Sequence, residues 1–77
     1  MKKQNVEKMV ADLLIKVYKQ KSDVLDTMPL DIDSLDKVEI AMWAEKEFGI
    51  EIYDDELMGW AFLSDIIKTI EEKKAQL

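Results

Sequence analysis

The sequence predicts an all-α protein, a small four-helix bundle with three longer helices, one short helix between the second and the last, and a long first loop. The chain has 77 residues, of which 48% are hydrophobic, and it contains only two glycines and one proline. Such a composition favours a compact helical protein over a disordered or fibrous one. The length suits one domain over residues 1–77, in which roughly 60% of the unfolded surface becomes buried.

The first helix is predicted over about residues 4 to 20. Its apolar side chains recur at spacings of three and four, which places them on one stripe of a helix. Asn5 is a candidate N-cap, because its side-chain oxygen can accept a hydrogen bond from a free amide of the first turn. The predicted stripe consists of Val6, Met9, Val10, Leu13, Leu14, Val17 and Tyr18.

A loop is expected over residues 21–33. Lys21, Ser22 and Asp23 interrupt the helical pattern, and Pro29 disfavours helix for the residue before it. A loop of this length in so small a domain is usually either functional or held down by its own apolar residues. The second explanation is favoured by four apolar candidates for anchors, Val24, Leu25, Met28 and Leu30.

The second helix is predicted from Ser34 to about Phe48. Asp33 can accept hydrogen bonds from amides of the first turn, and Asp36 three residues later forms an approximate capping box with it. Gly49 is suited to end the helix. The inward stripe is expected to contain Ile40, Ala41, Ala44 and Phe48, with Trp43 on its flank.

A second apolar line on this helix is formed by Leu35, Val38 and Met42. A helix in a four-helix bundle can bury two such lines, so core packing is the first interpretation. The alternative is that Leu35 and Met42 are partly exposed between acidic residues and form a docking ridge for another protein.

Beyond Gly49 the chain is expected to form an extended segment, a short helix and a last helix. Ile50 and Ile52 lie in an alternating run too short for a stable sheet, so they are expected to pack inward from a loop. The short helix is predicted over residues 54–58, before Gly59, and Ser64 is a candidate N-cap of the last helix. The core is expected to receive Trp60, Phe62, Leu63, Ile66, Ile67 and Ile70.

The composition also limits the chemistry. The chain contains neither histidine nor cysteine, so a Ser-His-Asp or Cys-His arrangement is impossible, and we predict that the protein is not an enzyme. Disulfides and zinc sites of the usual kind are excluded, and the lack of cysteine fits a reducing compartment. No apolar run has the length of a signal-peptide core or a membrane span, so we expect a cytoplasmic location without membrane insertion.

Negative charge is concentrated in one part of the chain. The formal net charge is −6, and between Asp31 and Glu56 ten acidic residues stand against two lysines. This field repels nucleic acid and anionic membranes and attracts basic protein surfaces, so we expect a monomer whose partners carry Lys/Arg patches. The alternative is an acidic face that only aids solubility.

Ser34 is the candidate functional residue. Of the three serines, Ser22, Ser34 and Ser64, only Ser34 combines a predicted helix N-terminus, an adjacent carboxylate and a flanking apolar residue. The dipole and free amides of a helix N-terminus stabilise an attached phosphate by typically about 0.3–1 kcal/mol. Since the chain lacks a base to activate the hydroxyl, the serine fits better as a substrate of another enzyme than as a catalyst. The alternative is an ordinary first helical residue behind an aspartate cap.

Over nearly its full length the chain resembles the acyl carrier protein family. The matching segments are Asp33-Ser34-Leu35-Asp36, Val38-Glu39-Ile40, Glu47-Phe48, Glu51-Ile52 and Asp54-Asp55-Glu56. In that family the serine of the DSL motif receives 4′-phosphopantetheine from coenzyme A, and the terminal thiol of this arm carries acyl groups as thioesters. The resemblance implies that Ser34 is the attachment point, with Asp33 and Leu35 beside it, and that the chain delivers acyl intermediates to fatty-acid or specialised, polyketide-like enzymes.

The resemblance implies partners and roles for further residues. The partners are a phosphopantetheinyl transferase and acyl-transferring and chain-extending enzymes with basic docking patches. Partner contacts are implied for Leu35, Asp36, Glu39, Met42 and Glu45, and an acyl cavity for Ile40, Ala41, Ala44, Phe48, Ile52 and Leu63.

Several positions differ from the family pattern. Asp31 stands where glycine is usual, Tyr53 stands where proline is common, and the loop before Ser34 is shorter than in typical fatty-acid carriers. Trp43 and Trp60 are bulky for their positions, which indicates an acyl cavity that is small, reshaped or absent. A specialised pathway therefore fits at least as well as general fatty-acid synthesis.

Two alternatives stay open beside the carrier. The first is an unmodified acidic helical interaction module, in which Ser34 is only part of a helix cap. The second is a calcium site at Asp31, Asp33 and Asp36. That spacing lacks the mid-loop glycine of an EF-hand, and Met42 stands where a bidentate glutamate belongs, so we predict no specific metal site.

Overall fold

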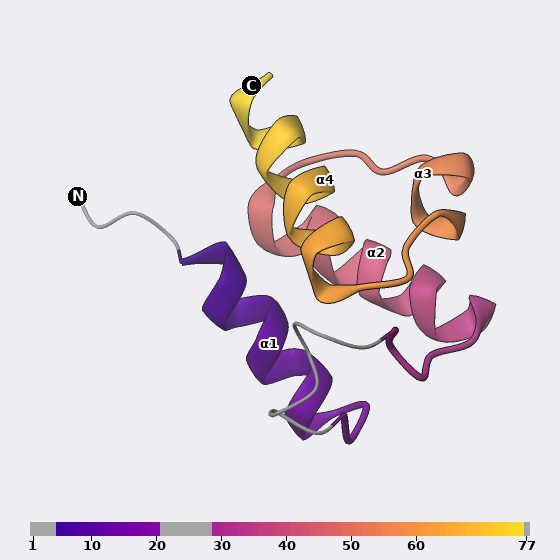
Figure 1. Ribbon diagram of the computed structural model, residues 1–77. Helices are drawn as coiled ribbons and strands as arrows, with labels where there is room; N and C mark the ends of the chain where they lie inside the picture. The colour runs from indigo at the N-terminus through magenta and orange to yellow at the C-terminus, as the bar shows by residue number, and fades with distance from the viewer. Residues whose placement is uncertain (1–4, 21–28, 77) are drawn as a thin grey trace.

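The computed structural model describes residues 5–20 and 29–76, which form four helices and no strand (Figure 1). The all-α prediction, with one short helix between the second and the last, is confirmed. Of the predicted first loop, residues 21–28 lie outside the described residues, and with them the anchors Val24, Leu25 and Met28. The helices are α1 (Val6–Lys16), α2 (Ser34–Phe48), α3 (Asp54–Met58) and α4 (Leu63–Ala75).

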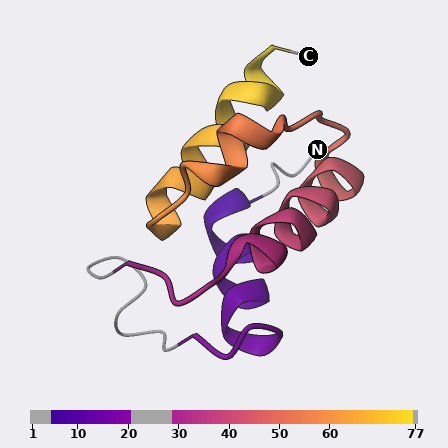
Figure 2. The same ribbon diagram turned by 90° about the vertical axis from the view of Figure 1, so that its right-hand side faces the viewer.

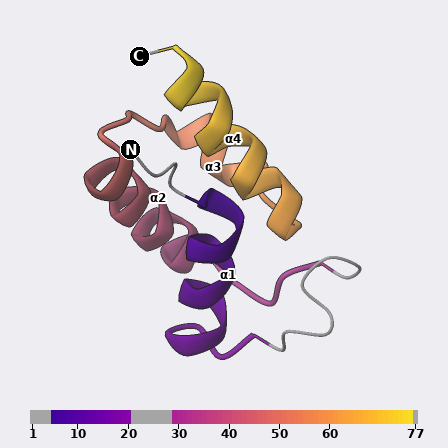
Figure 3. The same ribbon diagram turned by 90° about the vertical axis from the view of Figure 1, so that its left-hand side faces the viewer.

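The helices pack around α4, with α1 against α4 and with α2 against both α3 and α4. Figure 3 shows α1 in front, next to α2 and below α4. Figure 2, from the opposite side, shows α3 in front of α4. The short helix α3 therefore lies on the side of the molecule away from α1, and the N-terminal end of α2 stays at the edge of the bundle.

The core is formed mainly by the predicted apolar stripes. On α2 the whole inward stripe is buried, and Ile50 and Ile52 follow it inward as expected. Leu30 and Ile67 are partly buried against the same core. Full burial of such side chains stabilises the fold by about 1.5–3 kcal/mol each. The buried set is Val6, Val10, Leu14, Ile40, Ala41, Ala44, Phe48, Ile50, Ile52, Leu57, Trp60, Leu63, Ile66 and Ile70.

Helix α1 begins as predicted and ends early. The Asn5 side chain accepts a hydrogen bond from the amide of Lys8 at 3.0 Å, which confirms Asn5 as the N-cap. The predicted end near residue 20 is wrong, because the helix stops at Lys16 and Lys19 adopts a left-handed conformation with φ 58°. Val17 is 59% exposed, so its place on the buried stripe is also wrong. The backbone of Val17 keeps helical angles and its amide donates to the carbonyl oxygen of Leu13 at 2.9 Å, yet at this last position the side chain lies in solvent.

At the start of α4 two predictions are wrong. Ser64 lies inside the helix, and the carboxylate of Asp65 accepts instead from the backbone amides of Ala61 and Phe62, both at 3.0 Å. These two hydrogen bonds favour the charged form and lower the pKa of Asp65. Phe62 is not a core residue, because its extended backbone between buried Trp60 and Leu63 leaves the ring 38% exposed.

Candidate functional site at the N-terminus of helix α2

A reciprocal cap fixes the start of α2. The amide of Asp36 donates to Asp33 Oδ1 at 2.9 Å, and the amide of Asp33 donates to Asp36 Oδ2 at 3.3 Å. The predicted capping box is confirmed, with aspartate in the position that glutamate usually takes. Gly49 ends the helix with φ 67°, a conformation that glycine adopts without steric cost. Both ends of α2 are therefore set by residues close to them in the sequence.

Ser34 is the first residue of α2, and it is exposed. The first amides of a helix have no partner within the helix, so they point toward whatever lies at its N-terminus. Both neighbouring carboxylates, of Asp33 and Asp36, already accept backbone hydrogen bonds within the cap. An exposed hydroxyl with helix amides behind it suits an attached phosphodiester. Because the Ser34 side chain lies outside the core, a modifying enzyme can reach it.

The second apolar line of α2 is exposed, as the docking alternative requires. Leu35 is 65% exposed, Met42 62% and Val38 38%. We call these three residues the α2 ridge. Of the other residues predicted to contact partners, Glu39 is exposed and Asp36 and Glu45 are half-buried. The core interpretation of this line is therefore wrong, and a line of apolar side chains faces solvent beside Ser34.

Two of the predicted partner-binding acids also have partners inside the molecule, which the sequence reasoning missed. Glu39 Oε1 accepts from the hydroxyl of Tyr18 at 3.1 Å. Glu45 Oε2 accepts from the amide of Ile52 at 2.8 Å and so holds the segment after α2. Two features of the sequence could have indicated these contacts. Ile52 lies in an extended segment whose backbone amide needs an acceptor, and Tyr18 lies at the edge of the α1 stripe, where its hydroxyl needs a partner. Glu45 therefore has a structural role in addition to any contact with a partner.

Alkaline pH is expected to weaken the contact between Tyr18 and Glu39. Burial, the hydrogen bond to Glu39 and the negative charges of Glu39 and Asp36 raise the pKa of Tyr18 to about 12. Because the folded-state pKa lies above the unfolded value of 10.0, this contribution to stability is complete below pH 10 and is lost as the pH rises through 12. We expect Tyr18→Phe to lower the free energy of unfolding by about 0.5–1.5 kcal/mol at neutral pH.

Urea unfolding of the parent and of Tyr18→Phe over an alkaline pH series checks this prediction. The difference between the two proteins should shrink steadily above pH 10. Tyr53 also has a raised pKa, because it donates to Glu51, but it is present in both proteins and so does not affect the difference. A difference that stays constant up to pH 12 contradicts the assigned contact.

All six residues predicted to line an acyl cavity are buried in the core: Ile40, Ala41, Ala44, Phe48, Ile52 and Leu63. The two tryptophans differ in their surroundings. Trp60 is 2% exposed and its Nε1 donates to Thr69 Oγ1 at 3.0 Å. Trp43 is half-buried and packs edge-on against Phe48, with ring centroids 5.7 Å apart. Trp60 thus occupies interior volume that a smaller residue would leave free.

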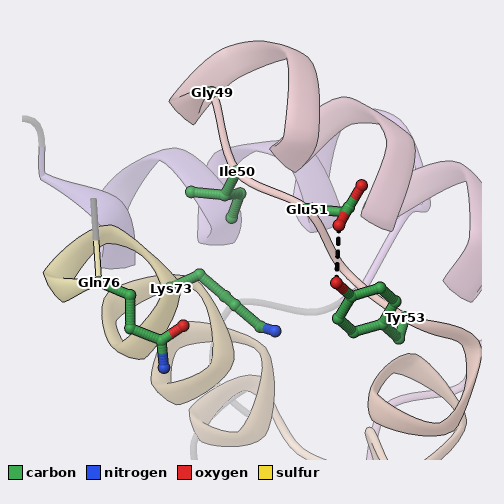
Figure 4. A pocket seen from close by; sticks show the side chains of 6 residues that line it. All are labelled: Gly49, Ile50, Glu51, Tyr53, Lys73 and Gln76. Carbon is green, nitrogen blue, oxygen red and sulfur yellow. Dashed lines mark hydrogen bonds between the residues drawn. The ribbon is translucent and has the colours of Figure 1, made fainter.

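The described part of the chain shows two hollows on its surface, and none of the six residues lines either. The first, of about 430 Å³, is lined by Gly49, Ile50, Glu51, Tyr53, Lys73 and Gln76 (Figure 4). Three of its polar side chains are paired: Lys73 Nζ lies 2.9 Å from Glu56 Oε1, and the hydroxyl of Tyr53 donates to Glu51 at 2.7 Å. The second, of about 360 Å³, is lined by Met9, Asp12, Leu13, Lys16, Val17, Trp43 and Glu47.

Within residues 5–20 and 29–76, no group of three or more acidic side chains is arranged to hold a metal ion. In the same ranges, none of the helices combines the length and the apolar character that crossing a membrane requires. Fold and site together define a class of protein, namely a small helical domain that displays a serine at a capped helix end, beside an exposed apolar ridge.

Comparison with known proteins identifies the family within this class. The family model described as "Phosphopantetheine attachment site" matches residues 25–70. An acyl carrier protein of Rickettsia massiliae (strain Mtu5) is 41% identical over 76 residues, which cover 94% of this chain and 85% of the relative. An acyl carrier protein of Rickettsia bellii (strain OSU 85-389) is 37% identical over 73 residues, covering 94% and 90%. One of Thermobifida fusca (strain YX) is 49% identical over 43 residues, covering 56% and 54%.

The chain belongs to the acyl carrier protein family. It is accordingly a carrier, and its prosthetic group is a covalently attached 4′-phosphopantetheine. This group supplies a thiol, which the chain itself lacks.

Proposed function

We propose that Ser34 is the residue to which 4′-phosphopantetheine is attached. The observation that carries this proposal is the position of Ser34, an exposed hydroxyl at the N-terminus of α2 within the segment that matches the phosphopantetheine attachment family. Asp33 supports the site by capping the helix, and exposed Leu35 borders it. Residues 1–77 are proposed to act as a single carrier domain.

The attachment chemistry requires a second enzyme. Ser34 Oγ attacks the β-phosphorus of coenzyme A and loses its proton to a base of the transferase. A new phosphorus–oxygen bond forms, the pyrophosphate linkage breaks, and 3′,5′-adenosine bisphosphate leaves. With neither histidine nor cysteine in the chain, the base comes from the phosphopantetheinyl transferase. The chain contributes an accessible hydroxyl and a helix end that stabilises the phosphodiester.

We further propose that the thiol of the arm carries acyl groups as thioesters to fatty-acid or polyketide-like biosynthetic enzymes in the cytoplasm, without catalysis by the chain. The α2 ridge and the exposed carboxylate of Glu39 are proposed as the surface that these enzymes contact. An apolar ridge among acids is complementary to an apolar patch rimmed by Lys and Arg. The six buried residues are proposed to shelter the start of the acyl chain, next to Trp60.

Intact mass spectrometry tests the attachment site. The unmodified protein is incubated with coenzyme A and a broad-specificity phosphopantetheinyl transferase, in parallel with Ser34→Ala. The parent is expected to gain one phosphopantetheine mass and Ser34→Ala none. Ser64→Ala is the matched control, because Ser64 is also exposed in the first turn of a helix, and it should be modified like the parent.

Two results would overturn the proposal. Equal modification of Ser34→Ala would place the arm on another residue. No modification of the folded parent would favour the unmodified interaction module, in which Ser34 is only part of the cap of α2.

A further inference from the structure

The side chain of Gln20 holds the chain segment that leads to Ser34. Its Oε1 accepts from the amide of Asp31 at 3.1 Å, and its Nε2 donates to the carbonyl oxygen of Asp31, also at 3.1 Å. Nε2 also donates to the carbonyl oxygen of Tyr18 at 3.2 Å. One amide side chain thus satisfies both backbone groups of Asp31, in the way that a neighbouring β-strand does.

Gln20 is itself fixed from the other side. Its backbone amide donates to the carbonyl oxygen of Leu14 in α1 at 3.0 Å. The left-handed conformation of Lys19, with φ 58°, reverses the chain just before it. A non-glycine residue adopts this conformation at an energetic cost, so the surrounding contacts must hold it in place. The end of α1 therefore presents the Gln20 side chain in a defined orientation.

Three successive anchors precede Ser34. The amide of Leu30 donates to the carbonyl oxygen of Ala61 at 2.7 Å, Gln20 holds Asp31, and Asp33 forms the cap of α2. The middle anchor is the only one of these three that comes from the end of α1. Asp31 is exposed and is three residues from the modified hydroxyl, so a loss of order there changes the surface that the transferase meets.

We infer that Gln20 is a positioning residue for the modification of Ser34, because it orders the backbone at Asp31 before the transferase binds. The inference rests on the proposed function of Ser34. Without the Gln20 side chain, the segment must be ordered during binding, and the entropic cost then appears as weaker binding. Once the complex has formed, the reacting atoms are unchanged. Gln20→Ala is therefore expected to raise the KM for the carrier about five- to tenfold while kcat stays unchanged.

Steady-state kinetics of the transferase with coenzyme A and the parent or Gln20→Ala carrier test this inference, at a temperature at which both carriers are folded. Amide hydrogen exchange gives a local readout, because the amide of Asp31 should exchange faster in Gln20→Ala. Gln20→Glu keeps the oxygen that accepts from Asp31 and loses both donors. Because a carboxylate oxygen would then face the carbonyl oxygens of Tyr18 and Asp31, its KM should be raised at least as much as that of Gln20→Ala.

Two controls separate positioning from general loss of stability. Gln76→Ala makes the same chemical change at the far end of α4, where no hydrogen bond of the Gln76 side chain is found in the described part of the chain, and it should leave KM unchanged. Asn5→Ala removes the cap at the other end of α1; it should lower the melting temperature and leave KM unchanged.

The outcomes distinguish this inference from the proposed function. A folded parent that is not modified refutes the proposed function. A parent that is modified, with Gln20→Ala showing the same KM, overturns only the role of Gln20. If Asn5→Ala raises KM as much as Gln20→Ala does, the role of Gln20 is also overturned, because the rise in KM then comes from a general loss of protein stability.

Discussion

Replacing Leu14 with alanine is expected to lower the free energy of unfolding by about 3 kcal/mol. The side chain is 0% exposed and belongs to the stripe by which α1 joins the core. The substitution removes three buried carbon atoms and leaves a cavity that α1 cannot close, because Val10 and Val6 hold the same face. A domain of 77 residues has a total stability of roughly 4–12 kcal/mol at the usual value per residue. The expected loss is therefore a large fraction of the total stability.

Urea denaturation followed by far-ultraviolet circular dichroism measures this change by linear extrapolation. Leu35→Ala is the matched control, since it makes the same substitution at a position that is 65% exposed. Its effect on the free energy of unfolding should stay within about 0.5 kcal/mol. Similar losses for both variants would mean that Leu14 and Leu35 are buried to a similar extent, contrary to the structure.

The helix ends that the sequence predicts well are those set by neighbouring residues. Helix α2 has the predicted bounds because Asp33, Asp36 and Gly49 act within a few positions of the ends they define. The end of α1 could not be predicted in this way. Its apolar spacing continues to Tyr18, but the helix stops at Lys16. Three residues later, the left-handed conformation of Lys19 turns the chain so that Gln20 reaches Asp31, eleven residues away in sequence. No local pattern encodes that contact.

The start of α4 shows a second limit. Ser64 and Asp65 can both accept hydrogen bonds from free amides, and serine is a common N-cap. The structure uses Asp65 in the third helical position, which moves the helix start to Leu63 and puts Phe62 outside it. A Ser64 cap would start the helix at Asp65, two residues later than the structure does, and such a shift changes which side chains face the core. The large apolar area of Phe62 predicts a core position, but this residue precedes the helix and its ring is 38% exposed.

At the candidate site, the sequence predicted which residues lie near Ser34 better than it predicted their contacts. The serine and its cap follow from the local sequence, and helical spacing places the three residues of the α2 ridge on one line, but the spacing favoured burial of that line and the structure exposes it. The hydrogen bond between Tyr18 and Glu39 joins residues 21 positions apart, and the one between Glu45 and Ile52 depends on how the chain turns after Gly49. These contacts belong to the tertiary structure, so a helical pattern identifies Glu39 and Glu45 only as surface acids.

Leu35→Ala is expected to lower kcat/KM for modification by the transferase about tenfold while stability is retained. Leu35 is 65% exposed, adjacent to Ser34 and part of the α2 ridge. An exposed leucine that becomes buried in a partner contributes through the area that it removes from water, about 0.8 kcal/mol for each fully buried carbon that truncation would remove. A tenfold loss corresponds to about 1.4 kcal/mol.

Val17→Ala is the control for exposure, because Val17 is 59% exposed at the end of α1 and lies outside the α2 ridge. Its kcat/KM should match that of the parent. The loss in Leu35→Ala should appear at all salt concentrations, whereas added salt should lower kcat/KM for parent and variant alike by screening the acidic field. Unchanged kinetics in Leu35→Ala would contradict docking through the ridge, and the exposed leucine would then have no assigned partner. Together with Leu14→Ala, which affects stability, this variant separates the leucine that holds the fold from the leucine that meets the partner.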